Sequence, residues 1–434
     1  MTPPRPGGGV PSVTLPLRYM VAAAVAFVLA AAGTVWLASE LAGHYYQPRV
    51  VALTHTVTLG WITLTIMGAS YQLIPIVLER PIWSERLARW QFLILTGGIA
   101  GMIAHFYIGT WPGLGLAASA VAIGAAFHLI NALASLRGVR TWSFTARLLA
   151  VALAGLTLTV LFGLALAADR LWKFLPGEFF PTLHAHFHLA LLGWVAPMVM
   201  GVAARVYPMF LLARDPEGWP GALQLWGLAL GSPAVALGLL AVPILVLPGA
   251  LAVGAAVAGH LAWVSEMAAS RKRPALDWGL RLALTGTAFL IPAGLMGLGF
   301  AADMLGGPRM GLAYGVLALG GWVSLTIVGM LFKIVPFLVW YRAYSPKVGK
   351  APVPTLAQLS WPRAEACTYG LLTVGVSALA LAVGVGDPLW IGGAGAIVVL
   401  GALAFAVSLA RVLTHLAPTP GRHRPTSTLS VHTR

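Results

Sequence analysis

The stretch VALTHTVTLGW, residues 51–61, decides the fold because the chain repeats its pattern twice more. HAHFHLALLGW, residues 184–194, again places a histidine five residues before a Gly-Trp pair, and GVLALGGW, residues 315–322, has Val316 at that position. A second glycine follows eight residues after the first, and a proline seven residues later: Gly60, Gly68 and Pro75; Gly193, Gly201 and Pro208; Gly321, Gly329 and Pro336. A repeat of this length predicts three copies of one structural unit.

A second repeated pattern precedes the first in each copy. In each copy an arginine and an acidic residue lie 22 residues apart at the two ends of an apolar run: Arg18 and Glu40, Arg147 and Asp169, Arg281 and Asp303. At about 1.5 Å per residue, a helix of that length spans roughly 33 Å, close to the thickness of a bilayer core. Each copy is therefore predicted to open with a membrane-spanning helix.

The composition is typical of a polytopic membrane protein, since 59% of the residues are hydrophobic and only 9% are charged. The net charge of +15 does not indicate nucleic-acid binding, because the basic residues lie in short loops between apolar runs. The single cysteine, Cys367, excludes an intrachain disulfide and a cysteine-based metal site.

We predict an all-α polytopic membrane protein in which twelve helices form three repeats of four, over residues 17–144, 145–278 and 279–416. Residues 1–16 and 417–434 are predicted to be disordered tails. The predicted spans are residues 17–39, 52–78, 91–110, 114–135, 145–167, 184–212, 221–241, 244–268, 279–302, 310–342, 366–386 and 389–414.

Lysine and arginine residues gather in the tails and in the loops that follow even-numbered spans. The loops on the other side carry only Arg49, Arg170, Lys173 and Arg309. Because cytoplasmic loops carry the excess of Lys and Arg, both termini are predicted to be cytoplasmic. Spans 2, 6 and 10 then run from outside to inside.

Six of the eleven histidines gather near the predicted outer face: His44, His55, His105, His184, His186 and His188. His184 and His188 share one helical face at four-residue spacing, whereas His186 is expected to point elsewhere. Neutral imidazole is a common ligand of haem iron and of copper, and ionisable residues inside membranes are usually functional.

We therefore predict cofactor binding by His55 and His188, which are equivalent in repeats 1 and 2. The predicted metal ligands are His55, His184, His186 and His188. The competing interpretation is that a histidine in a membrane donates a hydrogen bond between helices. We prefer that interpretation for His128 and His260, which lie near the inner ends of spans 4 and 8.

One further set of three polar residues occupies equivalent positions in the three copies. Gln72, Arg205 and Lys333 each lie three residues before a repeat proline, near the predicted inner face. The simpler interpretation is that the two cations extend to the lipid headgroups. The functional interpretation is an anion or proton site at the centre of the three repeats.

With these features the chain resembles subunit I of the haem-copper oxidase superfamily, and VALTHTVTLGW is most similar to its C-family oxidases and nitric oxide reductases. The resemblance covers all twelve spans and implies three pseudo-repeats of four. It also implies a b-type haem held towards the outer face, for which His55 matches the ligand in span 2. The implied setting is a bacterial inner membrane, with the lipid bilayer and a cytochrome or other electron-donor subunit as partners. The implied function is electron transfer or the handling of a small gas such as O2 or NO.

The chain departs from that family at three places. Span 10 has no histidine, span 7 has no histidine pair, and span 6 has three histidines where one copper ligand is usual. The usual binuclear centre is therefore incomplete, no catalytic residue is assigned, and a membrane oxidoreductase activity stays open. The NnrS group, linked to nitric oxide stress, has a similar span count and carries haem and copper. The alternatives are a copper-handling or transport protein that reuses the fold, and a cofactor-free assembly partner.

Overall fold

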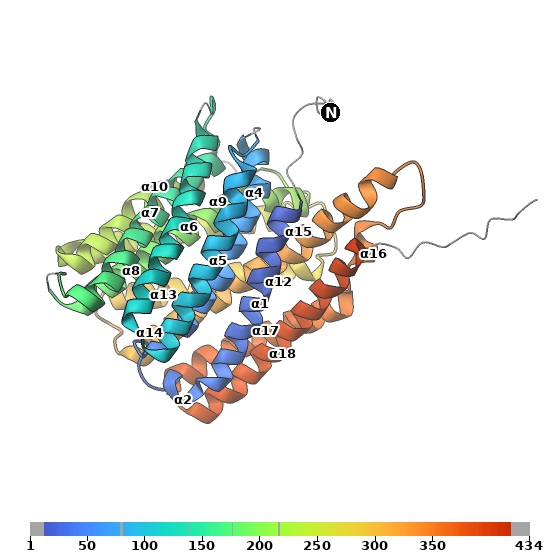
Figure 1. Ribbon diagram of the computed structural model, residues 1–434. Coiled ribbons are helices and arrows are strands. Elements are labelled where there is room, and N and C mark those ends of the chain that lie inside the picture. The colour runs from blue at the N-terminus through green and yellow to red at the C-terminus, as the bar shows by residue number, and fades with distance from the viewer. Residues whose placement is uncertain (1–12, 79–80, 138, 176, 216–217, 418–434) are drawn as a thin grey trace, which may run out of the picture.

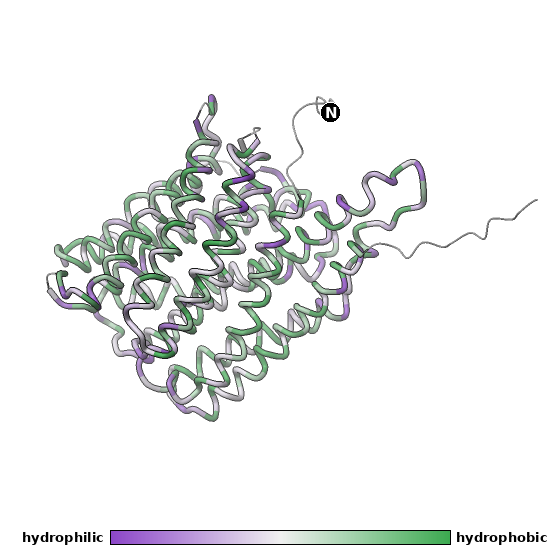
Figure 2. Tube along the Cα trace, in the orientation of Figure 1, coloured by the Kyte–Doolittle hydropathy of each residue, from purple (hydrophilic) through white to green (hydrophobic). Residues whose placement is uncertain are grey.

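The structure is a computed structural model that describes residues 13–78, 81–137, 139–175, 177–215 and 218–417 (Figure 1). The two predicted tails lie almost wholly outside these residues, except that the first helix already begins at Thr14. The described residues form helices and no strands, and twelve segments are long and apolar enough to cross a membrane. Hydrophobic residues follow the helices and polar residues gather at their ends (Figure 2). The predicted all-α polytopic fold is confirmed.

Nine spans lie at the periphery, and one of them, span 9, is broken at Phe289. They are α1 (Thr14–Trp36), α5 (Glu85–Ile108), α6 (Trp111–Leu136), α7 (Phe144–Trp172), α10 (Trp219–Leu240), α11 (Val246–Ala269), α12 (Trp278–Ala288) with α13 (Leu290–Ala301), α17 (Pro362–Val385) and α18 (Pro388–Leu413). The short elements are α2 (Ala38–Leu41), α16 (Leu356–Leu359), η3 (Pro243–Leu245), η5 (Ser345–Lys347) and η6 (Thr414–Leu416).

Spans 2, 6 and 10 each consist of an α-helix, a π-helical stretch and a second α-helix. The bounds are α3 (Pro48–His55), η1 (Thr56–Thr63) and α4 (Leu64–Leu78); α8 (Phe179–His188), η2 (Leu189–Val195) and α9 (Ala196–Leu211); α14 (Pro308–Gly315), η4 (Val316–Ser324) and α15 (Leu325–Tyr344). Every π stretch contains the Gly-Trp pair of its repeat. π-Helices are rare and cluster at functional sites, and the sequence patterns did not predict them.

These three spans form the centre of the bundle. In their most apolar windows 72%, 67% and 83% of the residues are buried, against 22–44% in the other nine spans. In each repeat the first helix packs along the central span, and the third and fourth helices pack as a pair. The fourth helix contacts the first helix of the next repeat, and α18 closes the ring against α1.

The second glycine of each repeat makes the same close contact three times. A Cβ atom on Gly68, Gly201 or Gly329 would lie 2.5, 3.0 or 3.1 Å from the Cβ of another residue. That residue directly follows the repeat arginine in every case: Tyr19, Leu148 and Leu282 respectively. Only a glycine allows this approach of the first helix to the central span. The threefold repeat therefore exists in the packing as well as in the sequence.

The three repeat tryptophans belong to the central spans and are buried. Trp61 Nε1 donates to Ser324 Oγ of repeat 3 at 3.0 Å, and Trp194 Nε1 lies 3.4 Å from Thr63 Oγ1 of repeat 1. Ser324 and Thr63 both follow their repeat glycine by three residues, and the equivalent residue of repeat 2 is Ala196. Because Ala196 has no hydroxyl, the cyclic pattern lacks its third acceptor. Trp322 Nε1 is indeed buried without a partner among the described residues.

Candidate functional site

The candidate site lies at the end of the bundle that carries His44, His55 and His184, which we call the histidine end. His55 is the last residue of α3 and His188 is the last residue of α8, so each directly precedes a π stretch. The sequence placed His184 at the start of span 6. However, α8 begins at Phe179, so the three histidines of this span lie more than one turn inside it.

His55 and His188 have the same hydrogen bond. His55 Nδ1 lies 2.8 Å from the carbonyl oxygen of Val51, and His188 Nδ1 lies 2.8 Å from that of His184. A carbonyl oxygen only accepts hydrogen bonds, so Nδ1 must carry the proton in both rings. Nε2 then keeps its lone pair. A histidine that ligates a metal is usually held in this way, with its other nitrogen bonded to a backbone carbonyl.

Aromatic side chains hold both rings in place. The His55 imidazole stacks on Phe106, with ring centroids 4.9 Å apart and the planes 23° from parallel. The His188 imidazole lies almost parallel to Tyr314, at 6.1 Å and 24°. Phe106 belongs to α5 of repeat 1 and Tyr314 to α14 of repeat 3, so the two histidines face different neighbours.

The sequence predicts that His186 points away from the face that His184 and His188 share. Its Nδ1 is buried and has no hydrogen-bond partner among the described residues, and its ring interacts with the backbone of Thr159 in α7. Gly163 of α7 leaves room for the ring, because a Cβ there would lie 3.0 Å from His186 Cε1. His186 therefore lies against α7 of its own repeat, whereas His184 contacts repeat 1 and His188 contacts repeat 3.

His184 is engaged with a tyrosine from the loop between α2 and α3. Its Nε2 lies 2.8 Å from the Tyr45 hydroxyl, and its ring also contacts Phe180. Burial raises the pKa of Tyr45, so the phenol keeps its proton at neutral pH, and the His184 tautomer decides which of the two groups donates. A metal at His184 Nε2 would have to displace that hydrogen bond.

The four predicted ligands therefore do not meet as one group. Within the described parts of the chain, no three His, Cys, Asp or Glu side chains lie close enough together to hold a metal ion. A haem needs only one or two axial nitrogens, and the free Nε2 atoms of His55 and His188 fit that need. The donor set present thus fits a haem better than a copper ion that requires three protein ligands.

Among the other histidines, His44, His105 and His260 have hydrogen-bond partners, and His128 has none among the described residues. His44 Nδ1 accepts from the Tyr46 amide at 3.0 Å, and His105 Nδ1 lies 2.6 Å from Thr110 Oγ1. His260 bonds to Gln224 at 3.1 Å, which supports its structural interpretation. His128 does not fit that interpretation, because both of its nitrogens are buried and lack a partner among the described residues.

At the opposite end of the bundle, the aligned set Gln72, Arg205 and Lys333 has three different surroundings. Lys333 is paired with Asp277, whose Oδ2 also lies 3.3 Å from Arg273. Arg205 is exposed, and Gln72 Oε1 is buried without a partner within the described residues. The set is therefore equivalent in sequence but not in environment, and the pairing of Lys333 favours a structural role for that residue.

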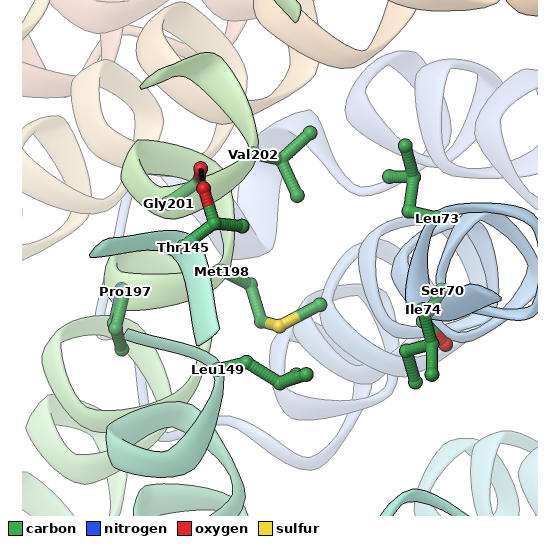
Figure 3. Close-up of a pocket in the computed structure, with 9 residues that line it drawn as sticks. All are labelled: Ser70, Leu73, Ile74, Thr145, Leu149, Pro197, Met198, Gly201 and Val202. Atoms are coloured by element: carbon green, nitrogen blue, oxygen red, sulfur yellow. Dashed lines mark hydrogen bonds between the residues drawn. The ribbon is translucent and has the colours of Figure 1, made fainter. Parts of the chain in front are cut away.

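A small cavity separates α4 of repeat 1 from α7 and α9 of repeat 2 (Figure 3). Leu149 and Met198 line it on one side and Leu73 and Ile74 on the other. Its volume of about 20 Å³ is that of a single water molecule, and its walls are almost entirely apolar. It is too small to be a ligand site.

No protein family model matches the sequence, and no characterised protein matches it significantly. The resemblance to haem-copper oxidases therefore stays a prediction, which rests on the residues described above.

Proposed function

We propose that the chain is a haem-binding membrane protein in which His55 and His188 provide the axial nitrogens for b-type haem. The observation that carries this proposal is their shared hydrogen bond from Nδ1 to a backbone carbonyl, which leaves Nε2 free in both. The two residues are also equivalent in repeats 1 and 2, since each lies five residues before the Gly-Trp pair of its repeat.

The residues of the chain would position the cofactor and isolate it. Phe106 and Tyr314 lie nearly parallel to the two imidazoles and fix their planes. A bound haem would supply one-electron transfer or the binding of a gas such as O2 or NO. His186 has a buried Nδ1 without a partner among the described residues and would be available to donate a hydrogen bond or a proton to such a group.

The test is the absorption spectrum and the haem and copper content of the purified full chain and its variants. We expect a Soret band and a reduced α-band in the unmodified protein. His55→Ala should lose most of the haem, and His188→Ala should lose it or change its coordination. His105→Ala is the matched control, because His105 lies at the same end but its Nδ1 is engaged by Thr110.

The outcomes separate the competing functions. If His55→Ala and His188→Ala both keep full haem content, the ligand assignment is wrong. Retention of haem in His188→Ala alone would leave His55 as the single axial ligand. Colourless protein that binds copper would favour a copper-handling function, and colourless protein without metal would favour an assembly partner.

We also propose that the histidine end faces outwards from a bacterial inner membrane, with both termini in the cytoplasm and a membrane-bound or soluble electron donor as partner. The asymmetry of Lys and Arg supports this orientation. Glu178 lies in the loop before α8, and Arg271 lies in the loop after α11. In a Cys367→Ser background, an impermeant thiol reagent should label Glu178→Cys from outside and should not label Arg271→Cys. The reverse pattern would refute the orientation.

A further inference from the structure

A cavity of about 390 Å³ opens at the histidine end, between α7, the start of α8 and the loop before α3. Arg170 and Lys173 line it together with the rings of Tyr46, Phe179 and Phe180. Small-molecule sites usually have volumes of roughly 300–1,000 Å³ and combine apolar walls with a few polar groups. The size and the lining of this cavity meet both conditions, and neither histidine of the proposed haem site belongs to it.

Three aromatic rings hold the guanidinium of Arg170. Its Cζ atom lies 4.6 Å from the ring centroid of Phe179, 5.0 Å from that of Tyr46 and 5.2 Å from that of Trp111. Cation–π contacts of this kind fix the position of the charge without neutralising it. The planar guanidinium of Arg170 keeps its N–H groups available for a carboxylate or a phosphate.

The cavity lining contains one acidic residue, Asp169. Asp169 Oδ1 accepts the amide of Leu175 at 2.8 Å, which ties the carboxylate to the loop backbone. Within the described residues, neither Arg170 nor Lys173 forms an ion pair. Glu178 lies nearby in the chain and is exposed, so it can turn to solvent. The lining therefore carries two positive charges and one negative charge, so it stays positive by one unit beside three aromatic walls.

We propose that this cavity is a binding site for an oxyanion, a carboxylate or phosphate, that carries an apolar or aromatic group. Arg170 and Lys173 bind the anionic group, and Tyr46, Phe179 and Phe180 contact the attached body. The ligand class has two sources, an anionic lipid headgroup at the membrane surface and a free aromatic oxyanion. Phe180 also contacts the His44 and His184 rings, so a bound ligand would lie beside the histidine cluster.

The test uses the full chain in phosphatidylcholine nanodiscs, titrated with 1-naphthyl phosphate and followed by calorimetry. Uncharged 1-naphthol and inorganic phosphate are the two half-ligands, and both should bind more weakly. Lys173→Gln should weaken the binding of naphthyl phosphate about fivefold, because one exposed charge is lost. Arg49→Gln is the matched control, since Arg49 also lies over a ring, that of Tyr107, but is paired with Glu40 outside the cavity.

Nanodiscs that contain phosphatidylglycerol distinguish the two sources. A lower apparent affinity for naphthyl phosphate in these discs would identify a lipid headgroup as a competing ligand, and an unchanged affinity would identify a free oxyanion. Lys173 is exposed, so its substitution does not threaten folding. Binding that stays the same in Lys173→Gln, or that naphthol matches, would overturn the proposal.

Discussion

The middle of the bundle keeps the threefold repeat, whereas the histidine end departs from it. In the middle, the glycine contacts recur in all three copies, and the tryptophan hydrogen bonds follow one cyclic pattern. At the histidine end, two copies carry His55 and His188 where the third carries Val316. The central packing needs the same small and flat side chains wherever helices meet closely, so each copy keeps them. A ligand needs donors on particular sides only, and a role in packing would not explain the uneven distribution of the histidines.

The largest effect is expected where α7 comes closest to the π stretch η2 of the central span 6. A Cβ on Gly155 would lie 2.0 Å from the carbonyl oxygen of Gly193, which is a backbone atom that cannot move away cheaply. Gly155→Ala should therefore cost about 3 kcal/mol or more and prevent normal assembly. Size-exclusion chromatography of a fluorescent fusion would measure this as loss of the monodisperse peak.

Gly97→Ala is the matched control, because Gly97 is also helical but no atom lies within 4 Å of its added Cβ. It should leave the melting temperature unchanged or raise it, since alanine favours a helix by about 1 kcal/mol relative to glycine. Equal behaviour of the two variants would show that α7 and η2 do not pack as described.

The second effect concerns the end opposite the histidines, where the copies also differ. Lys333→Met removes a partner of Asp277, leaving Arg273 at 3.3 Å, and should cost about 2 kcal/mol. Arg205→Met changes the equivalent residue of repeat 2, which is exposed, and should change stability by less than about 0.5 kcal/mol. The melting temperatures of the two variants measure the difference. An equal loss in both would mean that the ion pair contributes nothing.

Much of the fold could be predicted from the sequence because it depends on local and periodic features. The apolar runs define the spans, and the glycines, tryptophans and charged pairs define the repeat. The π stretches could not be predicted, since their residues are mostly apolar and such a run does not record how many residues make one turn. The site was only partly predictable for a different reason. The neighbours of His186, and the pairing of Lys333 with Asp277, depend on which helix lies beside which, and the spacing within one span does not contain that information.

A third prediction compares two tryptophans of the central ring. Trp61→Phe removes the hydrogen bond to Ser324, whereas Trp322→Phe removes an N–H group that has no partner among the described residues. Both changes shorten a buried ring, so the loss of volume is similar. Trp61→Phe should be the more destabilising by about 1 kcal/mol, the usual contribution of one such bond. A larger decrease in melting temperature for Trp322→Phe would contradict the cyclic arrangement.

The smallest expected effect is an increase in stability. Ala196 stands where Thr63 and Ser324 supply acceptors to the tryptophan of a neighbouring repeat, and it is buried. Ala196→Ser should give Trp322 Nε1 its missing acceptor and raise stability by about 0.5–1 kcal/mol, seen as a higher melting temperature. Ala203→Ser is the control, because Ala203 is buried in the same helix but is not equivalent to Thr63 and Ser324. The gain should also vanish when Ala196→Ser is combined with Trp322→Phe, since no N–H then remains to be satisfied. A gain that persists in the double variant would show that the new hydroxyl acts elsewhere and that the ring of repeat contacts does not close at Trp322.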